Sequence, residues 1–260
     1  MAGLPLVLAI VSGKGGVGKT TLAVNLAVGL GDSGRVVLFD GDSGLANAHI
    51  LLGVRPTRSI ADAVRGEATV DKVAEPTPWG IDLVAGSSGA PELLRATEDD
   101  RRALGHALEM LFNHYDIAVI DCPAGADDLA LRHTELASEI VVVLTGEPTS
   151  FLDAYSTLKE LSNRYRRTHF NVVLNSVDSE DDAVNLFSRF HAVTTRFLDI
   201  ELCYLGYVRR DAAVERAVLR CKPVLAESSA RGAGADISAI ARRIGALALQ
   251  SAGASTRRAH

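Results

Sequence analysis

Short apolar runs alternate along the chain with stretches whose apolar residues recur at helical spacing. The runs occupy residues 6–11, 35–39, 79–84, 115–120, 140–144, 170–174 and 202–208. Runs of this length predict strands, and their scarcity of polar residues indicates burial on both faces. Strands of this kind form parallel sheets with helices on both sides. The pattern therefore predicts an α/β fold with a doubly wound, mostly parallel sheet of seven or eight strands.

Helices are predicted between these runs. Periodic apolar residues indicate helices over 19–30, 98–113, 181–198 and 236–250. A further helix is expected to start with Thr149 or Ser150 as its N-cap and to run through Leu161. Short helical turns at 59–64 and 69–73 each begin with a serine or threonine cap. Within the 181–198 helix, we expect three phenylalanines to face inward: Phe187, Phe190 and Phe197.

The last predicted helix, 236–250, has one apolar face, made of Ile237, Ile240, Ile244 and Leu247. A helix on a membrane surface has such a face, and so does the last core helix of a domain. This face has no large aromatic residue and is diluted by alanine, which favours the core helix. Since no repeat or linker interrupts the chain, we expect one domain over 1–250 and a short polar tail over 251–260.

The composition narrows the classes of function. The chain has 260 residues, a net charge of −5 and three cysteines. Its acidic balance argues against a strongly basic nucleic-acid-binding surface. Cys122, Cys203 and Cys221 lie far apart, which argues against a disulfide framework or a paired-cysteine metal site and fits a reducing cytosol. The first apolar run is too short to span a bilayer and follows no basic segment, so we expect a strand and not a signal peptide.

The segment after the first predicted strand carries the candidate chemistry. Residues 11–21 read V-S-G-K-G-G-V-G-K-T-T and fit G-x-x-x-x-G-K-[ST] between a strand and a helix. In such a loop, backbone N–H groups and the helix N-terminus bind phosphate oxygens. Lys19 is expected to reach the β- and γ-phosphates, and Thr20 to ligate Mg²⁺. The alternative is a tight turn that merely contains glycines. The expected nucleotide-binding residues are Gly13, Lys14, Gly15, Gly16, Val17, Gly18, Lys19, Thr20 and Thr21.

Aspartates end two of the predicted strands. Asp40 and Asp42 follow the second strand, and Asp121 follows a later one. Because ligands of doubly wound sheets bind at the carboxyl ends of strands, these carboxylates should lie near the phosphates. An apolar strand that ends in aspartate downstream of a P-loop is typical of a Walker B site for Mg²⁺. The alternative role of Asp40 and Asp42 is capping of a helix or turn. Cys122 is expected to be a packing residue, with a redox sensor as the alternative.

The sequence K-G-G-V-G-K-T, with its additional Lys14, resembles the deviant P-loop of the MinD/ParA ATPase superfamily. The stretches D-G-D-S-G-L-A-N from Asp40 and D-C-P-A-G from Asp121 resemble switch I and switch II of that superfamily. The resemblance implies that Lys14 crosses a dimer interface to the nucleotide of the partner, with a solvated loop lysine as the alternative. It also implies that Asp40 supports the Mg²⁺ site and that Asp42 orients the attacking water. The implied catalytic residues are Lys14, Lys19 and Asp42, and the implied metal-binding residues are Thr20, Asp40 and Asp121.

The stretch E-P-T-S-x-x-D-A-Y-x-x-x-K over 147–159 resembles the flagellar branch of the superfamily (FlhG/FleN, also YlxH) more than MinD itself. By the same resemblance, Asn175 contacts adenine, and the segment with Arg209 and Asp211 closes the adenine pocket. An ordinary turn asparagine is the alternative for Asn175. Arg209 stands where the family usually has proline, a departure that bears on the shape of the pocket.

The resemblance implies an Mg²⁺-dependent ATPase that binds ATP or ADP and forms a homodimer in the ATP state. Its implied role is the regulation of flagellar number and placement, in the cytoplasm or after recruitment to the membrane or cell pole. The implied partner is a flagellar transcription activator or an FlhF-type GTPase. Membrane association is left open, and DNA binding is not expected. Three alternatives are a MinD-type division-site ATPase, a ParA-type partition ATPase that binds DNA, and a nitrogenase-type iron–sulfur carrier, which the cysteine positions disfavour.

Overall fold

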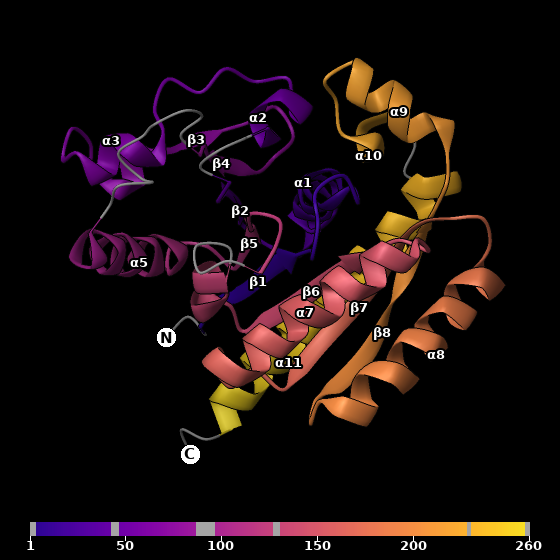
Figure 1. The fold of residues 1–260 in the computed structure, drawn as a ribbon. Helices are drawn as coiled ribbons and strands as arrows, with labels where there is room; N and C mark the ends of the chain where they lie inside the picture. Colours follow the sequence, from indigo (N-terminus) through magenta and orange to yellow (C-terminus); the bar gives the residue numbers. More distant parts are fainter. Residues whose placement is uncertain (1–3, 43–46, 87–96, 127–130, 228–229, 258–260) are drawn as a thin grey trace.

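The computed structural model of the protein describes residues 4–42, 47–86, 97–126, 131–227 and 230–257 (Figure 1). The strands are β1 (Leu6–Val11), β2 (Val36–Asp40), β3 (Ala74–Pro76), β4 (Asp82–Val84), β5 (Ile117–Asp121), β6 (Glu139–Leu144), β7 (His169–Val177) and β8 (Glu201–Arg209). The α-helices are α1 (Lys19–Gly29), α2 (Ala48–Leu51), α3 (Ile60–Val64), α5 (Glu98–Phe112), α7 (Pro148–Tyr165), α8 (Glu180–Phe197), α9 (Ala212–Leu219), α10 (Val224–Glu227) and α11 (Gly232–Arg257). Short 3-10 helices are η1 (Gly31–Ser33), η2 (Val70–Lys72) and η3 (His133–Leu136).

Two predicted segments lie partly outside the described residues. The structure does not describe residues 43–46 of the predicted switch I. It also does not describe residues 87–89 of the glycine–serine loop that the sequence places after the strand at 79–84.

The described strands form one eight-stranded sheet in the order β3-β4-β2-β5-β1-β6-β7-β8 (Figure 1). Neighbouring strands are parallel, except that β3 and β4 are antiparallel. The predicted doubly wound, mostly parallel sheet is therefore confirmed. β1 lies between β5 and β6, and Asp40 of β2 is opposite Asp121 of β5 in the register. Three chain segments with polar residues consequently meet at one edge of the sheet: the loop after β1 and the ends of β2 and β5.

A layer of helices covers each face of the sheet. α5, α7 and α8 pack on one face, and α1 and α11 pack on the other (Figure 1). Alternate residues of β1 point to opposite layers: Leu8 and Ile10 contact the α1 and α11 layer, whereas Ala9 and Val11 contact the α7 layer. Both sets are buried. Burial on both faces is the reason why the strands are continuous apolar runs in the sequence.

The last helix is a core helix along its described apolar face. Ile237, Ile240 and Ile244 are each at most 2% exposed, and α11 packs against β8 and α1. The core-helix prediction is confirmed for these residues, which are not available to a membrane surface. α11 extends to Arg257, into the segment predicted to be a polar tail. Across the described part of the chain, no helix is both long and apolar enough to cross a bilayer.

Two local predictions were wrong. Neither Thr149 nor Ser150 is the N-cap of α7: the cap is Glu147, with Pro148 at the first helical position, where its missing N–H has no cost. The Ser150 hydroxyl instead accepts a hydrogen bond from the Thr145 N–H at 3.0 Å. Phe197 does not face inward but is 66% exposed. It is the last residue of α8, and periodicity fixes the face of a helix without fixing where the underlying sheet ends.

Candidate nucleotide-binding site

The loop between β1 and α1 has the backbone that the P-loop motif requires. Gly16 and Gly18 have φ angles of 82° and 84°, in the left-handed region that side chains disfavour. Gly13 lies directly against the backbone of α7, so that a Cβ atom there would be 2.1 Å from the Asp153 carbonyl carbon. The first glycine of the motif is therefore needed for packing of the loop on α7, and the last one for the turn into α1.

Lys19 and two aspartates form a buried charged group beside this loop. The Lys19 ammonium forms an ion pair with Asp121, and both side chains are buried. Burial, together with the charge of nearby Asp121, raises the pKa of Asp40 to about 7. Burial also raises the pKa of Asp121, although the charge of Lys19 opposes this shift. One lysine thus faces two buried carboxyl groups. When both are ionised, their negative charge exceeds the single positive charge of Lys19.

These residues fit a Mg²⁺ site. The Asp121 Oδ2 atom is buried and has no hydrogen-bond partner among the described residues. Mg²⁺ prefers oxygen ligands, keeps several waters and uses one or two carboxylates together with phosphate oxygens. In the described part of the chain, no group of three or more His, Cys, Asp or Glu residues could hold a metal. The buried carboxylates therefore suit a Mg²⁺ ion that shares its coordination with phosphate oxygens and water.

Two cavities adjoin the loop. The first, of about 540 Å³, is lined by Lys14, Lys19, Thr20 and Asp42, among others, which brings the predicted catalytic residues together. The second, of about 750 Å³, extends from the loop to the ends of β7 and β8. The loop residues Gly16 and Gly18 line both cavities. A triphosphate on the loop can therefore have its nucleoside in the second cavity.

The predicted adenine-pocket residues line the second cavity, but they differ in their contacts. Asn175 Nδ2 donates a hydrogen bond to the Val17 carbonyl at 2.7 Å. The Arg209 guanidinium is bound to Asp236 of α11, with Nε and Nη2 at 2.7 Å and 2.8 Å from its carboxylate oxygens. The Asp211 carboxylate accepts from the Ala213 and Ala233 N–H groups and so caps α9 and the start of α11. Arg209 and Asp211 therefore hold the wall of this cavity together through their side chains.

Lys14 has other partners than Lys19. Its ammonium forms an ion pair with Glu147 and donates a hydrogen bond to Thr149 Oγ1 at 3.0 Å. Glu147 is the N-cap of α7, and Thr149 lies in its first turn. The sequence singled out this E-P-T-S stretch as a feature of the flagellar branch, yet nothing in it indicated a contact with Lys14. Glu147 and Asp236 are thus the residues near the site that sequence reasoning missed.

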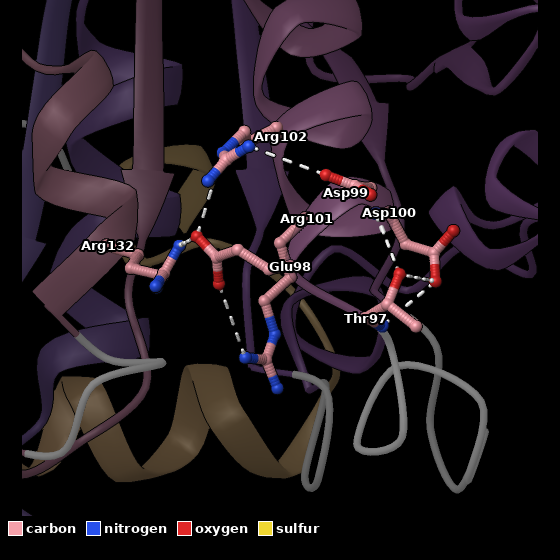
Figure 2. Close-up of polar contacts among 7 residues, drawn as sticks. All are labelled: Thr97, Glu98, Asp99, Asp100, Arg101, Arg102 and Arg132. Carbon is pink, nitrogen blue, oxygen red and sulfur yellow. Dashed lines mark hydrogen bonds and ion pairs between the residues drawn. The ribbon is translucent and has the colours of Figure 1, made fainter.

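Arg132 contacts the start of α5 through a cluster of charged side chains. Arg132 Nη1 is 2.7 Å from Glu98 Oε1, and Arg101 and Arg102 also lie close to the Glu98 carboxylate (Figure 2). The hydrogen bond from Arg132 lowers the pKa of Glu98.

Next to the site, Cys122 is fully buried, and burial raises the pKa of its thiol to about 12. A thiol with this pKa is unreactive, which supports packing and not redox sensing as the role of Cys122.

Comparisons with known proteins agree with this geometry. The family model "CobQ/CobB/MinD/ParA nucleotide binding domain" matches residues 8–224. The chain is 36% identical to the antiactivator FleN of Pseudomonas aeruginosa over 239 residues. The alignment covers 92% of this chain and 85% of FleN. It is 30% identical to the flagellum site-determining protein YlxH of Helicobacter pylori, over 81% of this chain and 72% of YlxH. The MinD structure from Pyrococcus horikoshii, solved with Mg-ADP, has a TM-score of 0.80 at 24% identity and covers 95% of this chain and 98% of that chain.

The chain belongs to the CobQ/CobB/MinD/ParA nucleotide-binding family. Within this family it is a P-loop ATPase of the MinD/ParA type, with ATP or ADP and Mg²⁺ as its cofactors. Its similarity to FleN and YlxH confirms the resemblance to the flagellar branch that the sequence indicated.

Proposed function

We propose that this ATPase is an ATP-driven dimerisation switch that regulates flagellar number and placement. The proposed dimerisation rests on the position of Lys14. Lys19 is the buried cation of its own site, whereas the Lys14 ammonium lies at the start of α7. A second loop cation gains most if it binds the triphosphate of another subunit. The flagellar part is supported by the similarity to FleN, an antiactivator, and to YlxH, a flagellum site-determining protein.

Each residue of the site has one role in the proposed mechanism. Loop N–H groups and Lys19 bind the β- and γ-phosphates, and Asp42 orients the water that attacks the γ-phosphate. Thr20 would ligate Mg²⁺, with Asp40 and Asp121 supporting it. The ion would neutralise charge that develops on the phosphate oxygens. Turnover is expected to be slow in the isolated protein, because the dimer itself is the switch.

Asn175 is proposed to recognise the base. Its Nδ2 hydrogen bond to the Val17 carbonyl leaves the amide oxygen as an acceptor. Adenine has an amino donor at its sixth position, whereas guanine has an acceptor there. The amide orientation that the P-loop carbonyl fixes therefore favours adenine.

Replacing Asn175 with aspartate is expected to weaken ATP binding about tenfold, because a carboxylate cannot donate to the Val17 carbonyl and repels it. Isothermal titration calorimetry with ATP and with GTP checks this result, and the wild type should prefer ATP. Asn163→Asp, at an exposed position of α7, is the matched control and should bind ATP like the wild type. Equal ATP affinities of Asn175→Asp and the wild type would remove Asn175 from the base site.

Deleting the gene is expected to change flagellar number or position, giving several flagella or misplaced ones. Electron microscopy of the deletion strain, with the wild-type gene restored as the control, measures this directly. Normal flagellation together with minicells would contradict the flagellar role and favour a MinD-type division function. Retention of the purified protein on DNA that falls steeply with salt would favour a ParA-type partition function.

A further inference from the structure

Two acceptors hold Lys14 within its own subunit. The carboxylate of Glu147 pairs with the Lys14 ammonium, and the Thr149 hydroxyl accepts from it at 3.0 Å. The Lys14 side chain is 29% exposed and that of Glu147 is 66% exposed. The contact is therefore at the surface, where ion pairs contribute at most about 1 kcal/mol. An interaction of this size can form and break as part of a functional cycle.

The backbone fixes the partners of Lys14 on both sides. Gly13 packs on the backbone of Asp153 in α7, which sets the P-loop against this helix. Pro148, at the first position of α7, restricts Glu147 to an extended conformation, as its φ and ψ of −73° and 135° show. These constraints place the P-loop lysine at the N-terminus of α7.

Electrostatics makes Glu147 necessary for this arrangement. The N-terminus of a helix carries a partial positive charge and disfavours a cation nearby. The Glu147 carboxylate supplies the opposite charge at this position. Without it, the Lys14 ammonium would face the positive end of an eighteen-residue helix and would move towards solvent.

We propose that Glu147 and Thr149 are positioning residues that form a latch on Lys14 in the nucleotide-free subunit. This inference rests on the proposed dimer switch. Two acceptors at the start of α7 already engage the Lys14 ammonium, so a phosphate of the other subunit must compete with Glu147 and Thr149 for this group, and dimerisation works against the latch. The latch thereby opposes dimerisation of subunits without nucleotide.

Glu147 lies in the wall of the cavity that is proposed to bind the nucleoside. Gly146, Glu147 and Pro148 line the same cavity of about 750 Å³ as Asn175. A nucleoside bound there lies beside the segment that holds Lys14. Occupation of this cavity therefore brings the nucleotide next to the latch, which still has to open when the dimer forms.

The first test measures Lys14 in the monomer, without ATP. An acetylating amine reagent is added to nucleotide-free protein, and mass spectrometry gives the labelling rate of Lys14 relative to exposed Lys159. Glu147→Gln should raise this ratio about two- to fivefold, because an exposed ion pair that protects the amine is lost. Thr149→Val should raise it less. Glu109→Gln, at an exposed glutamate of α5, is the control with the same charge change and should leave it unchanged.

The second test measures dimerisation with Mg-ATP by light scattering. Because two latches open for each dimer, the effects multiply, and Glu147→Gln should form dimers at about four- to twenty-five-fold lower protein concentration than the wild type. The difference should shrink at 1 M salt, where exposed ion pairs are screened.

The two tests separate the latch from the switch. Equal Lys14 labelling in Glu147→Gln and the wild type would overturn the latch, whether or not the protein dimerises. Weaker dimerisation of Glu147→Gln would also overturn it and would assign Glu147 to the interface. Faster labelling with no dimer in either protein would support the latch contact and contradict the proposed dimer switch.

Discussion

Replacing Lys19 with alanine is expected to lower the affinity for ATP at least about a hundredfold, because a charge-assisted contact with the phosphates is lost from a buried site. The structure adds a second reason. Lys19 is the cation paired with Asp121, and Asp40 lies beside them, so that the variant faces an incoming triphosphate with two buried acids and without the lysine that pairs with them. Calorimetric titration with Mg-ATP measures the loss.

Two controls keep this result interpretable. Lys19→Met retains the length of the side chain without its charge and should lose affinity to a similar extent, even if the alanine variant folds poorly. Lys159→Ala, at an exposed position of α7, should bind ATP like the wild type. An unchanged ATP affinity in a folded Lys19 variant would contradict the assignment of this loop as the phosphate-binding site.

Substitutions of Asp42 and Lys14 are expected to separate hydrolysis from dimerisation. Asp42→Ala should bind ATP, stall hydrolysis and accumulate a dimer, because Asp42 acts on the attacking water and not on binding. Lys14→Ala should bind ATP but stay monomeric and hydrolyse it poorly, because the contact between subunits is lost. The double variant should be monomeric, since trapping requires Lys14. Light scattering with Mg-ATP and a phosphate-release assay measure these outcomes.

The two single variants control for each other, because both residues line the same cavity of about 540 Å³. If Asp42→Ala stays monomeric well above the concentration that saturates it with ATP, the composite site is wrong. Normal dimerisation of Lys14→Ala would contradict it equally. An ordinary P-loop enzyme with a self-contained site would then be the better interpretation.

Most of the fold could be predicted from the sequence, because β1, β2, β5 and β6 are buried on both faces and are therefore apolar except at their ends. The antiparallel β3 was missed. It is three residues long, contains a proline and is not buried, so it has no apolar pattern of its own. The N-terminus of α7 was misplaced because Thr149 and Ser150 are good caps in isolation, whereas Pro148 sets the start of the helix earlier.

The candidate site was predictable to the extent that its motifs are contiguous. The glycines that turn the P-loop, and the aspartates that end β2 and β5, act through their own backbone position, which a short stretch of sequence reveals. The partners of the charged side chains were not predictable in this way. Arg209 was expected at the adenine pocket, and its guanidinium is bound to Asp236.

The sequence by itself determined a P-loop ATPase on a parallel sheet, because strand burial, glycine turns and phosphate-binding amides depend on residues that are close along the chain. Only the tertiary structure decided which acids the two loop lysines contact. Lys14 and Glu147 are 133 positions apart, and Lys19 and Asp121 are 102 apart. These pairs form because the strand order places β1 between β5 and β6, and the residues that follow these strands consequently meet at one edge of the sheet.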